Sequence, residues 1–142
     1  MPSEYIPVAL ARLVIERADG RCEYCQSRAD YATEDFAVDH IWARSRGGKS
    51  VADNLAYACS GCNGRKYNKS EATDPIDGMM APLYNPRTQM WSEHFTWDAE
   101  FTRIIGTTPI GRATVLALQM NRIGVVNLRK ALYAIGQHPS QL

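Results

Sequence analysis

Four cysteines stand in two C-x2-C pairs, Cys22 with Cys25 and Cys59 with Cys62. A C-x2-C turn directs both sulfurs toward one point, and two such turns complete the tetrahedral thiolate shell that zinc prefers. Four thiolates leave no open coordination position, so the predicted zinc is structural and not catalytic. Free buried cysteines and disulfides are the alternatives, and two matched pairs with no cysteine left over favour zinc.

A second group of residues has the chemistry for phosphodiester hydrolysis, which needs a base for the water and a divalent ion for the developing charge. His40 titrates in the range of a general base. Asp39, beside it, is a hard oxygen ligand suited to Mg²⁺ or Mn²⁺. Asn63 can offer a side-chain oxygen to the same ion. Asn54 either orients the imidazole or pins the intervening loop without touching it.

The elements that must position these residues are short. Residues 36–40 alternate in polarity, which predicts a strand, and residues 54–58 predict a second one. Neighbouring side chains in a strand point to opposite faces, so Asp39 and His40 need a distorted strand end to reach one phosphate. The loop over residues 41–53, with two glycines at its middle, provides such an end.

The rest of the chain predicts helices, a hairpin and an irregular connection. Periodic apolar residues predict a helix over residues 7–18, and the second cysteine pair leads into a short polar helix. The further expectations are a turn-rich irregular connection over 71–90, hairpin strands near 94–97 and 101–105, and helices over 109–119 and 124–135.

Charge is distributed in blocks although the net charge is only +1. Residues 39–70 carry six basic and two acidic side chains, while residues 1–38 carry four basic and seven acidic ones. A focused positive patch can hold a phosphate backbone on a near-neutral protein. The predicted nucleic-acid contacts are Arg44, Arg46, Lys49, Arg65 and Lys66.

The order of these residues resembles the HNH endonuclease family. The family pattern runs C-x2-C, D-H-I, a loop with S-x-G-G, N-L, and C-x2-C-N followed by a basic residue. The matching positions are Cys22 and Cys25, Asp39 to Ile41, Ser45 to Gly48, Asn54 and Leu55, Cys59, Cys62 and Asn63, and Lys66. The resemblance covers roughly residues 8–70. It departs at Ala43, where proline is frequent, and at Asn63, a variant of the final histidine that favours a hard ion.

The resemblance implies an α+β protein with a ββα-metal module and a structural zinc site of four cysteines, followed by a C-terminal hairpin and helices. The implied domains are a nuclease module over residues 1–70 and an extension over 71–142 packed on it. His40 would be the general base and Asn54 would orient it. Asp39 and Asn63 would hold catalytic Mg²⁺ or Mn²⁺. The implied activity is DNA endonuclease cleavage that leaves 5′-phosphate and 3′-hydroxyl ends.

Several alternatives stay open. A non-catalytic zinc module could bind nucleic acid or a protein partner, and the basic surface could engage RNA instead of DNA. The start of the chain lacks the pattern of a signal peptide, and the cysteines suggest a reducing compartment, so we expect a cytoplasmic protein of bacterial or phage origin. Other expectations are a structural aromatic cluster for His94 with Trp91 and Trp97, and a solvated His138. Two alternatives stay open for four arginines, an extension of the binding surface or helix-surface charges: Arg103, Arg112, Arg122 and Arg129.

Overall fold

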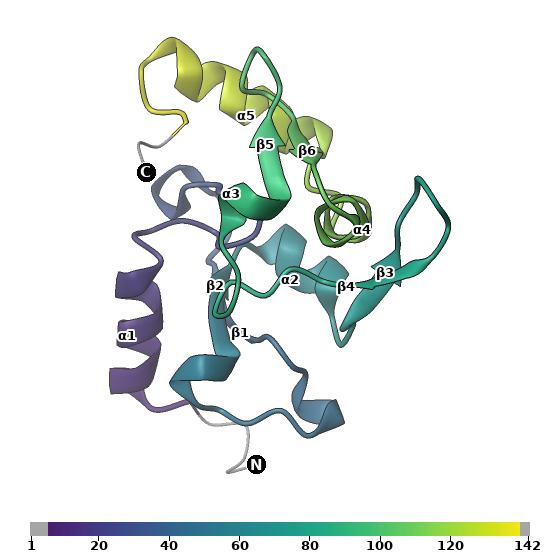
Figure 1. Ribbon diagram of the computed structural model, residues 1–142. Coiled ribbons are helices and arrows are strands. Elements are labelled where there is room, and N and C mark those ends of the chain that lie inside the picture. Colours follow the sequence, from purple (N-terminus) through teal and green to yellow (C-terminus); the bar gives the residue numbers. More distant parts are fainter. Residues whose placement is uncertain (1–5, 140–142) are drawn as a thin grey trace.

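The computed structural model describes residues 6–139, and its centre is a two-stranded hairpin followed by a helix (Figure 1). β1 (Ala37–His40) pairs antiparallel with β2 (Leu55–Ala58), and His40 lies opposite Leu55. α2 (Ser60–Lys66) follows directly, with Cys59 as its N-cap residue. This arrangement confirms the predicted α+β class and fits an HNH ββα-metal module.

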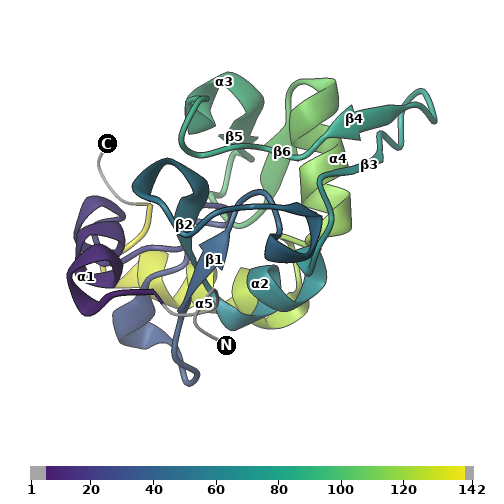
Figure 2. The ribbon, with the colours of Figure 1, turned by 90° about the horizontal axis from the view of Figure 1, so that it is seen from below.

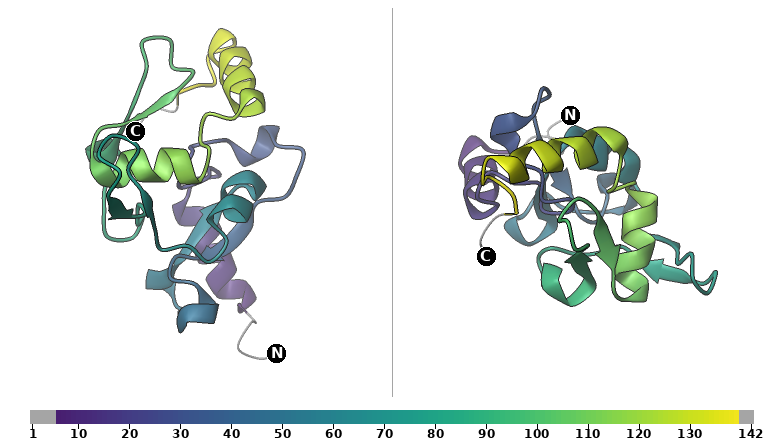
Figure 3. Two further views of the ribbon diagram at one scale, coloured as in Figure 1. Left: turned by 90° about the vertical axis from the view of Figure 1, so that its right-hand side faces the viewer. Right: turned by 90° about the horizontal axis from the view of Figure 1, so that it is seen from above.

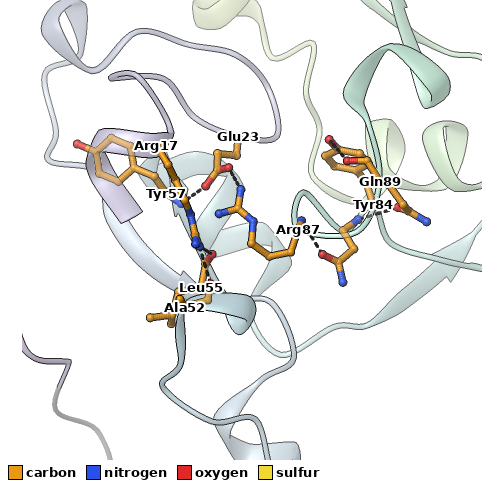
Figure 4. Close-up of polar contacts among 9 residues, drawn as sticks. Arg17, Glu23, Ala52, Leu55, Tyr57, Tyr84, Arg87 and Gln89 are labelled. Atoms are coloured by element: carbon orange, nitrogen blue, oxygen red, sulfur yellow. Dashed lines mark hydrogen bonds and ion pairs between the residues drawn. The ribbon is translucent and has the colours of Figure 1, made fainter. Parts of the chain in front are cut away.

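α1 (Val8–Arg17) packs on this hairpin from the side opposite to α2 (Figure 2). Pro7 precedes its first turn, as the sequence predicts. The Arg17 guanidinium donates hydrogen bonds to the backbone oxygens of Ala52 and Leu55, where the loop enters β2 (Figure 4). The first helix therefore holds the end of the loop as well as the strands.

The loop between β1 and β2 depends on its two glycines. Gly47 has a φ of +92°, a left-handed conformation that favours glycine. A Cβ atom at Gly48 would lie 1.7 Å from the backbone oxygen of Trp42, so a larger residue cannot occupy that position without moving the chain. The glycines thus let the loop fold back tightly against its own first residues.

The C-terminal half contains more regular structure than the sequence predicts. The expected hairpin is present as β5 (Phe95–Trp97) and β6 (Ile104–Gly106), and the expected helices as α4 (Pro109–Ala117) and α5 (Ile123–Ala134). The prediction of an irregular segment over 71–90 was wrong, since it holds a projecting hairpin of β3 (Glu71–Thr73) and β4 (Met80–Pro82), and α3 (Trp91–His94) begins just after it (Figures 1 and 3).

The β3–β4 turn explains that difference. Asp74 and Asp77 accept hydrogen bonds from the backbone amides of Ile76 and Met79, at 3.0 and 2.8 Å. Gly78 supplies a φ of +74°. Aspartate and glycine at these positions are a hairpin signal, and the surrounding prolines concealed it.

One hydrophobic cluster draws buried side chains from both halves of the chain. Trp91 contacts Phe95 and Trp97 at centroid distances of 5.1 and 5.6 Å, and its indole N–H donates to the backbone oxygen of Tyr24. The buried members of the cluster are Cys22, Tyr24, Cys25, Ala56, Ala58, Cys59, Cys62, Leu83, Tyr84, Phe95, Ile104, Leu118 and Met120. The C-terminal half therefore packs directly on the cysteines.

A half-buried ion pair adds a polar link between the halves. Glu23 pairs with Arg87, and its second carboxylate oxygen accepts a hydrogen bond of 2.8 Å from the Tyr57 amide (Figure 4). Burial lowers the pKa of Arg87 to about 10, and the nearby Arg17 charge acts in the same direction. Among residues 6–139, no helix has the length and apolar character needed to cross a membrane.

Candidate metal centre and catalytic site

The four cysteines converge, as the sequence predicts. Their sulfur atoms all lie within 4.8 Å of one another, and all four residues are buried. The Cys25 and Cys59 sulfurs are 3.6 Å apart. Zinc–sulfur bonds of about 2.3 Å place the sulfurs of a tetrahedron about 3.8 Å apart, so this donor set fits one zinc ion.

The turns around the cluster are also suited to thiolates. The amides of Cys25 and Cys62 each donate to the sulfur three residues earlier, both at 3.4 Å. Hydrogen bonds with the other cysteines, that with Cys22 first, lower the pKa of Cys25 and of Cys59, whereas burial raises the pKa of Cys22. Among the described residues, this cluster is the one group of at least three histidine, cysteine or acidic side chains close enough to hold a metal ion.

Asp39 lies on the face of β1 that packs against α2. It is 9% exposed, and one of its carboxylate oxygens, Oδ2, is 3.1 Å from Nζ of Lys66. Oδ2 accepts no hydrogen bond within the described chain, so this contact is an ion pair without hydrogen-bond geometry. Burial raises the pKa of Asp39, and the Lys66 charge opposes that shift.

Lys66 occupies a different environment from the expected phosphate-facing one. Its side chain is buried, and Nζ also donates a 2.8 Å hydrogen bond to the backbone oxygen of His40. The ammonium thus joins two consecutive residues of β1 to α2. Asn63 is half-buried on α2, three positions before Lys66, and residues with this spacing are neighbours on a helix surface.

His40 is half-buried, and its side chain meets the loop. Its Nε2 lies 2.8 Å from the hydroxyl oxygen of Ser50. Burial lowers the pKa of His40, and the Arg44 and Lys66 charges add to that effect, so the neutral imidazole is favoured at pH 7. The sequence did not predict Ser50 as a partner of His40, because serine is common in loops. The one feature that could have indicated it is its position just after the two glycines and Lys49.

The Asn54 side chain holds the loop through hydrogen bonds to backbone groups. Its side-chain oxygen accepts from the Trp42 amide at 2.8 Å. Its side-chain nitrogen donates to the backbone oxygens of Trp42 and Lys49, both at 3.0 Å. This geometry corresponds to the loop-pinning alternative. Because Lys49 precedes Ser50, Asn54 also fixes the chain beside the partner of His40.

The basic side chains predicted to contact nucleic acid do not form one uniform surface. Arg46 and Lys49 are exposed on the loop, while Arg44 and Arg65 are half-buried. Arg65 donates to the backbone oxygen of Gly61 at 3.2 Å. Arg46 and Lys49 therefore present the freest positive charge near His40 among these candidates.

The other two histidines lie away from this group. His94 contacts the Thr108 hydroxyl at 2.7 Å and meets the Tyr84 ring edge-on, which agrees with the expected structural role. His138 is not solvated as expected, because its Nε2 lies 2.7 Å from the Phe101 backbone oxygen and its ring packs on Trp97.

Two of the four arginines expected to extend a binding surface or to be helix-surface charges are instead turned inward, Arg129 buried and Arg122 half-buried. Arg129 is 4% exposed and donates to the backbone oxygens of Thr102 and Met120, at 2.9 and 2.8 Å. Its guanidinium also lies 5.1 Å from the Trp97 ring centre. Arg122 is half-buried beside the cysteines.

Comparison with known proteins concerns the segment that contains the four cysteines, Asp39, His40 and Asn63. The family model for the HNH endonucleases matches residues 22–69. Residues 22–69 are therefore similar to an HNH endonuclease domain. Over 121 residues the chain is 26% identical to the Septu protein PtuB of Bacillus thuringiensis, a match that covers 84% of this chain. The match covers 42% of PtuB, so the chain spans less than half the length of that relative.

Proposed function

We propose that this protein is a metal-dependent DNA endonuclease with His40 as its general base. The observation that carries the proposal is the position of His40 within the HNH segment. Its imidazole is half-buried and lies against Ser50 of the loop, and its lowered pKa favours the neutral form at pH 7. The family match supports nuclease chemistry in general.

We assign the base role to Nδ1, in the tautomer in which Nε2 carries the proton and faces Ser50. A hydrogen bond donated by Nε2 to the Ser50 hydroxyl leaves Nδ1 unprotonated. An unprotonated ring nitrogen can take a proton from the attacking water. In this proposal Ser50 holds the ring orientation, and Asn54 keeps the loop that carries Ser50 in place.

Asp39 and Asn63 would hold the catalytic divalent ion, which would neutralise negative charge developing on the phosphate. Their oxygen donors suit Mg²⁺ or Mn²⁺, and Mg²⁺ is commonly bound through one or two carboxylates together with substrate phosphates. The Lys66 ammonium repels a cation at Oδ2 of Asp39. Asp39 would therefore bind an ion through its other oxygen, or after Lys66 has moved.

The four cysteines would hold structural zinc. Cys62 directly precedes Asn63, so the zinc centre would also fix the position of a ligand to the catalytic ion. Loss of zinc should then abolish cleavage without any change to His40 or Asp39.

The exposed loop cations support nucleic acid as the substrate. Arg46 and Lys49 lie on the same loop as Ser50, close to where a phosphate would have to meet His40. We favour DNA, with RNA to be distinguished by competition. Free thiols persist in reducing compartments. Together with a relative from a bacterium, this supports a cytoplasmic protein of bacterial or phage origin.

Nicking of supercoiled plasmid in Mg²⁺ or Mn²⁺ tests the proposal, with the wild type beside His40→Ala. Loss of a general base costs about 10²–10⁴ in rate, so the variant should nick at least about a hundredfold more slowly at equal zinc content. Equal rates would reject the catalytic role of His40. A protein that binds DNA but leaves it intact would instead support the alternative, a zinc-stabilised binding module.

A further inference from the structure

Two arginines of the C-terminal helix direct their guanidinium groups at the four-cysteine cluster. Arg122 is the N-cap residue of α5, and its Nη2 lies 3.6 Å from the Cys59 sulfur. Its Nη1 lies 3.9 Å from the Cys62 sulfur. Arg129, two turns later, places Nη2 3.4 Å from the backbone oxygen of Cys25. Arg122 thus lies against the sulfurs, and Arg129 against the backbone of the first cysteine turn.

Neither guanidinium has a carboxylate partner among residues 6–139. Apart from the sulfurs, Arg122 donates to the backbone oxygens of Leu118 and Gln119, both at 2.9 Å. Arg129 donates to backbone oxygens and to the side chain of Asn121. A cation taken from water without an anionic partner is costly. A zinc ion with four thiolates carries two excess negative charges, which the two arginines balance.

The fold leaves room for Arg122 at this position. A Cβ atom at Gly61 would lie 2.7 Å from Cζ of Arg122, so the bare glycine allows the guanidinium to rest on the second cysteine turn. Cys59 and Arg122 also line a surface cleft of about 580 Å³, which extends between α2 and α5. Cys59 is 6% exposed, whereas Cys22, Cys25 and Cys62 have no exposed surface. Arg122 therefore lies beside the most exposed of the four cysteines.

We propose that Arg122 is a positioning residue of the zinc centre, and that the C-terminal extension serves to retain zinc through it. Its guanidinium donates to the thiolates of Cys59 and Cys62, neutralises part of their charge and shields Cys59 from the cleft. The proposal rests on zinc occupancy, which is part of the proposed function. It gives the extension a role that the HNH segment alone does not supply.

Zinc release tests the proposal without any use of nuclease activity. Zinc-loaded protein is mixed with excess chelator, and a colorimetric zinc indicator follows the release rate. Loss of an outer hydrogen-bond partner typically costs 10–100-fold in metal affinity, so Arg122→Gln should release zinc about 10–100-fold faster. Arg122→Lys keeps the positive charge but lacks the paired N–H groups of the guanidinium. Its zinc release rate should therefore lie between those of the wild type and Arg122→Gln. Lys130→Gln removes an exposed charge from the same helix and should match the wild type.

Gly61→Ala gives a second test that leaves every charge in place. The added methyl group displaces the Arg122 guanidinium, yet alanine favours a helix more than glycine does. We therefore expect Gly61→Ala to release zinc faster than the wild type although its α2 helix is intrinsically more stable. This variant also replaces Arg122→Gln as the test if Arg122→Gln does not fold. Wild-type release rates in both Arg122→Gln and Gly61→Ala would overturn the proposal. Wild-type protein that purifies without zinc would instead overturn the zinc centre itself.

Discussion

Lys66→Met would remove the buried cation that joins β1 to α2. The substitution keeps the length and apolar stem of the side chain but leaves Asp39 without its partner at 3.1 Å. It also leaves the His40 backbone oxygen without the 2.8 Å hydrogen bond from Nζ. Both groups belong to the end of β1 that carries the proposed base. The loss of stability should therefore arise at the proposed catalytic site.

The magnitude follows from the burial of the pair. The Lys66 and Asp39 side chains are 2% and 9% exposed, and removal of one partner of such a pair typically costs about 3–5 kcal/mol. Protonation of Asp39, whose pKa burial already raises, limits the loss at this site. For a chain of this size, each kcal/mol lowers the melting temperature by about 3–4 °C, so Lys66→Met should melt about 10–15 °C below the wild type.

Urea unfolding of four proteins measures the coupling: the wild type, Asp39→Asn, Lys66→Met and the double variant. The double variant leaves no uncompensated buried charge. Its loss of unfolding free energy should therefore be clearly smaller than the sum of the losses in the two single variants. Lys69→Met is the matched control, since Lys69 is exposed on the same segment and should change stability by less than about 0.5 kcal/mol. Additive effects of Asp39→Asn and Lys66→Met would refute the buried pair.

Two further perturbations test the loop and the second hairpin. Asn54→Ala removes the hydrogen bonds to Trp42 and Lys49, so hydrogen exchange should speed up across residues 41–53 while zinc content stays unchanged; an unaltered exchange pattern would contradict the pinning role. Arg112 of α4 donates two hydrogen bonds to the Asp74 carboxylate at the β3–β4 turn, at 2.9 and 2.7 Å. These bonds lower the pKa of Asp74 in the folded protein, so the stabilisation by the pair is full above the unfolded value of about 3.9 and is lost as pH falls through the lower folded value. Asp74→Asn should thus have a lower melting temperature than the wild type at pH 7, and this difference should shrink toward pH 2. A difference in melting temperature that does not change with pH would contradict the Asp74–Arg112 ion pair.

Local patterns were enough to predict the HNH segment. The spacing of the cysteines indicates two turns that meet, and the alternation around Asp39 indicates a strand end. These features depend on residues close together in the chain. The hairpin and α2 follow from them, which is why the fold class could be predicted before the structure was known.

The polar contacts that complete the site could not be predicted in this way. Lys66 looks like any basic residue on a short polar helix, and its burial depends on Asp39, 27 positions earlier. Arg129 follows the surface pattern of a helix, yet it reaches Cys25 across 104 positions of sequence. A charge is buried only where the tertiary fold supplies its partner, and no local pattern reports that partner.

The most direct test of the central claim is chemical rescue of His40→Gly in the plasmid-nicking assay with Mn²⁺. The variant should keep its zinc and lose at least about a hundredfold in rate, because the base is gone. Added imidazole should then restore part of that rate in His40→Gly and leave the wild type unchanged. Nicking by His40→Gly at the wild-type rate without imidazole would contradict His40 as the general base.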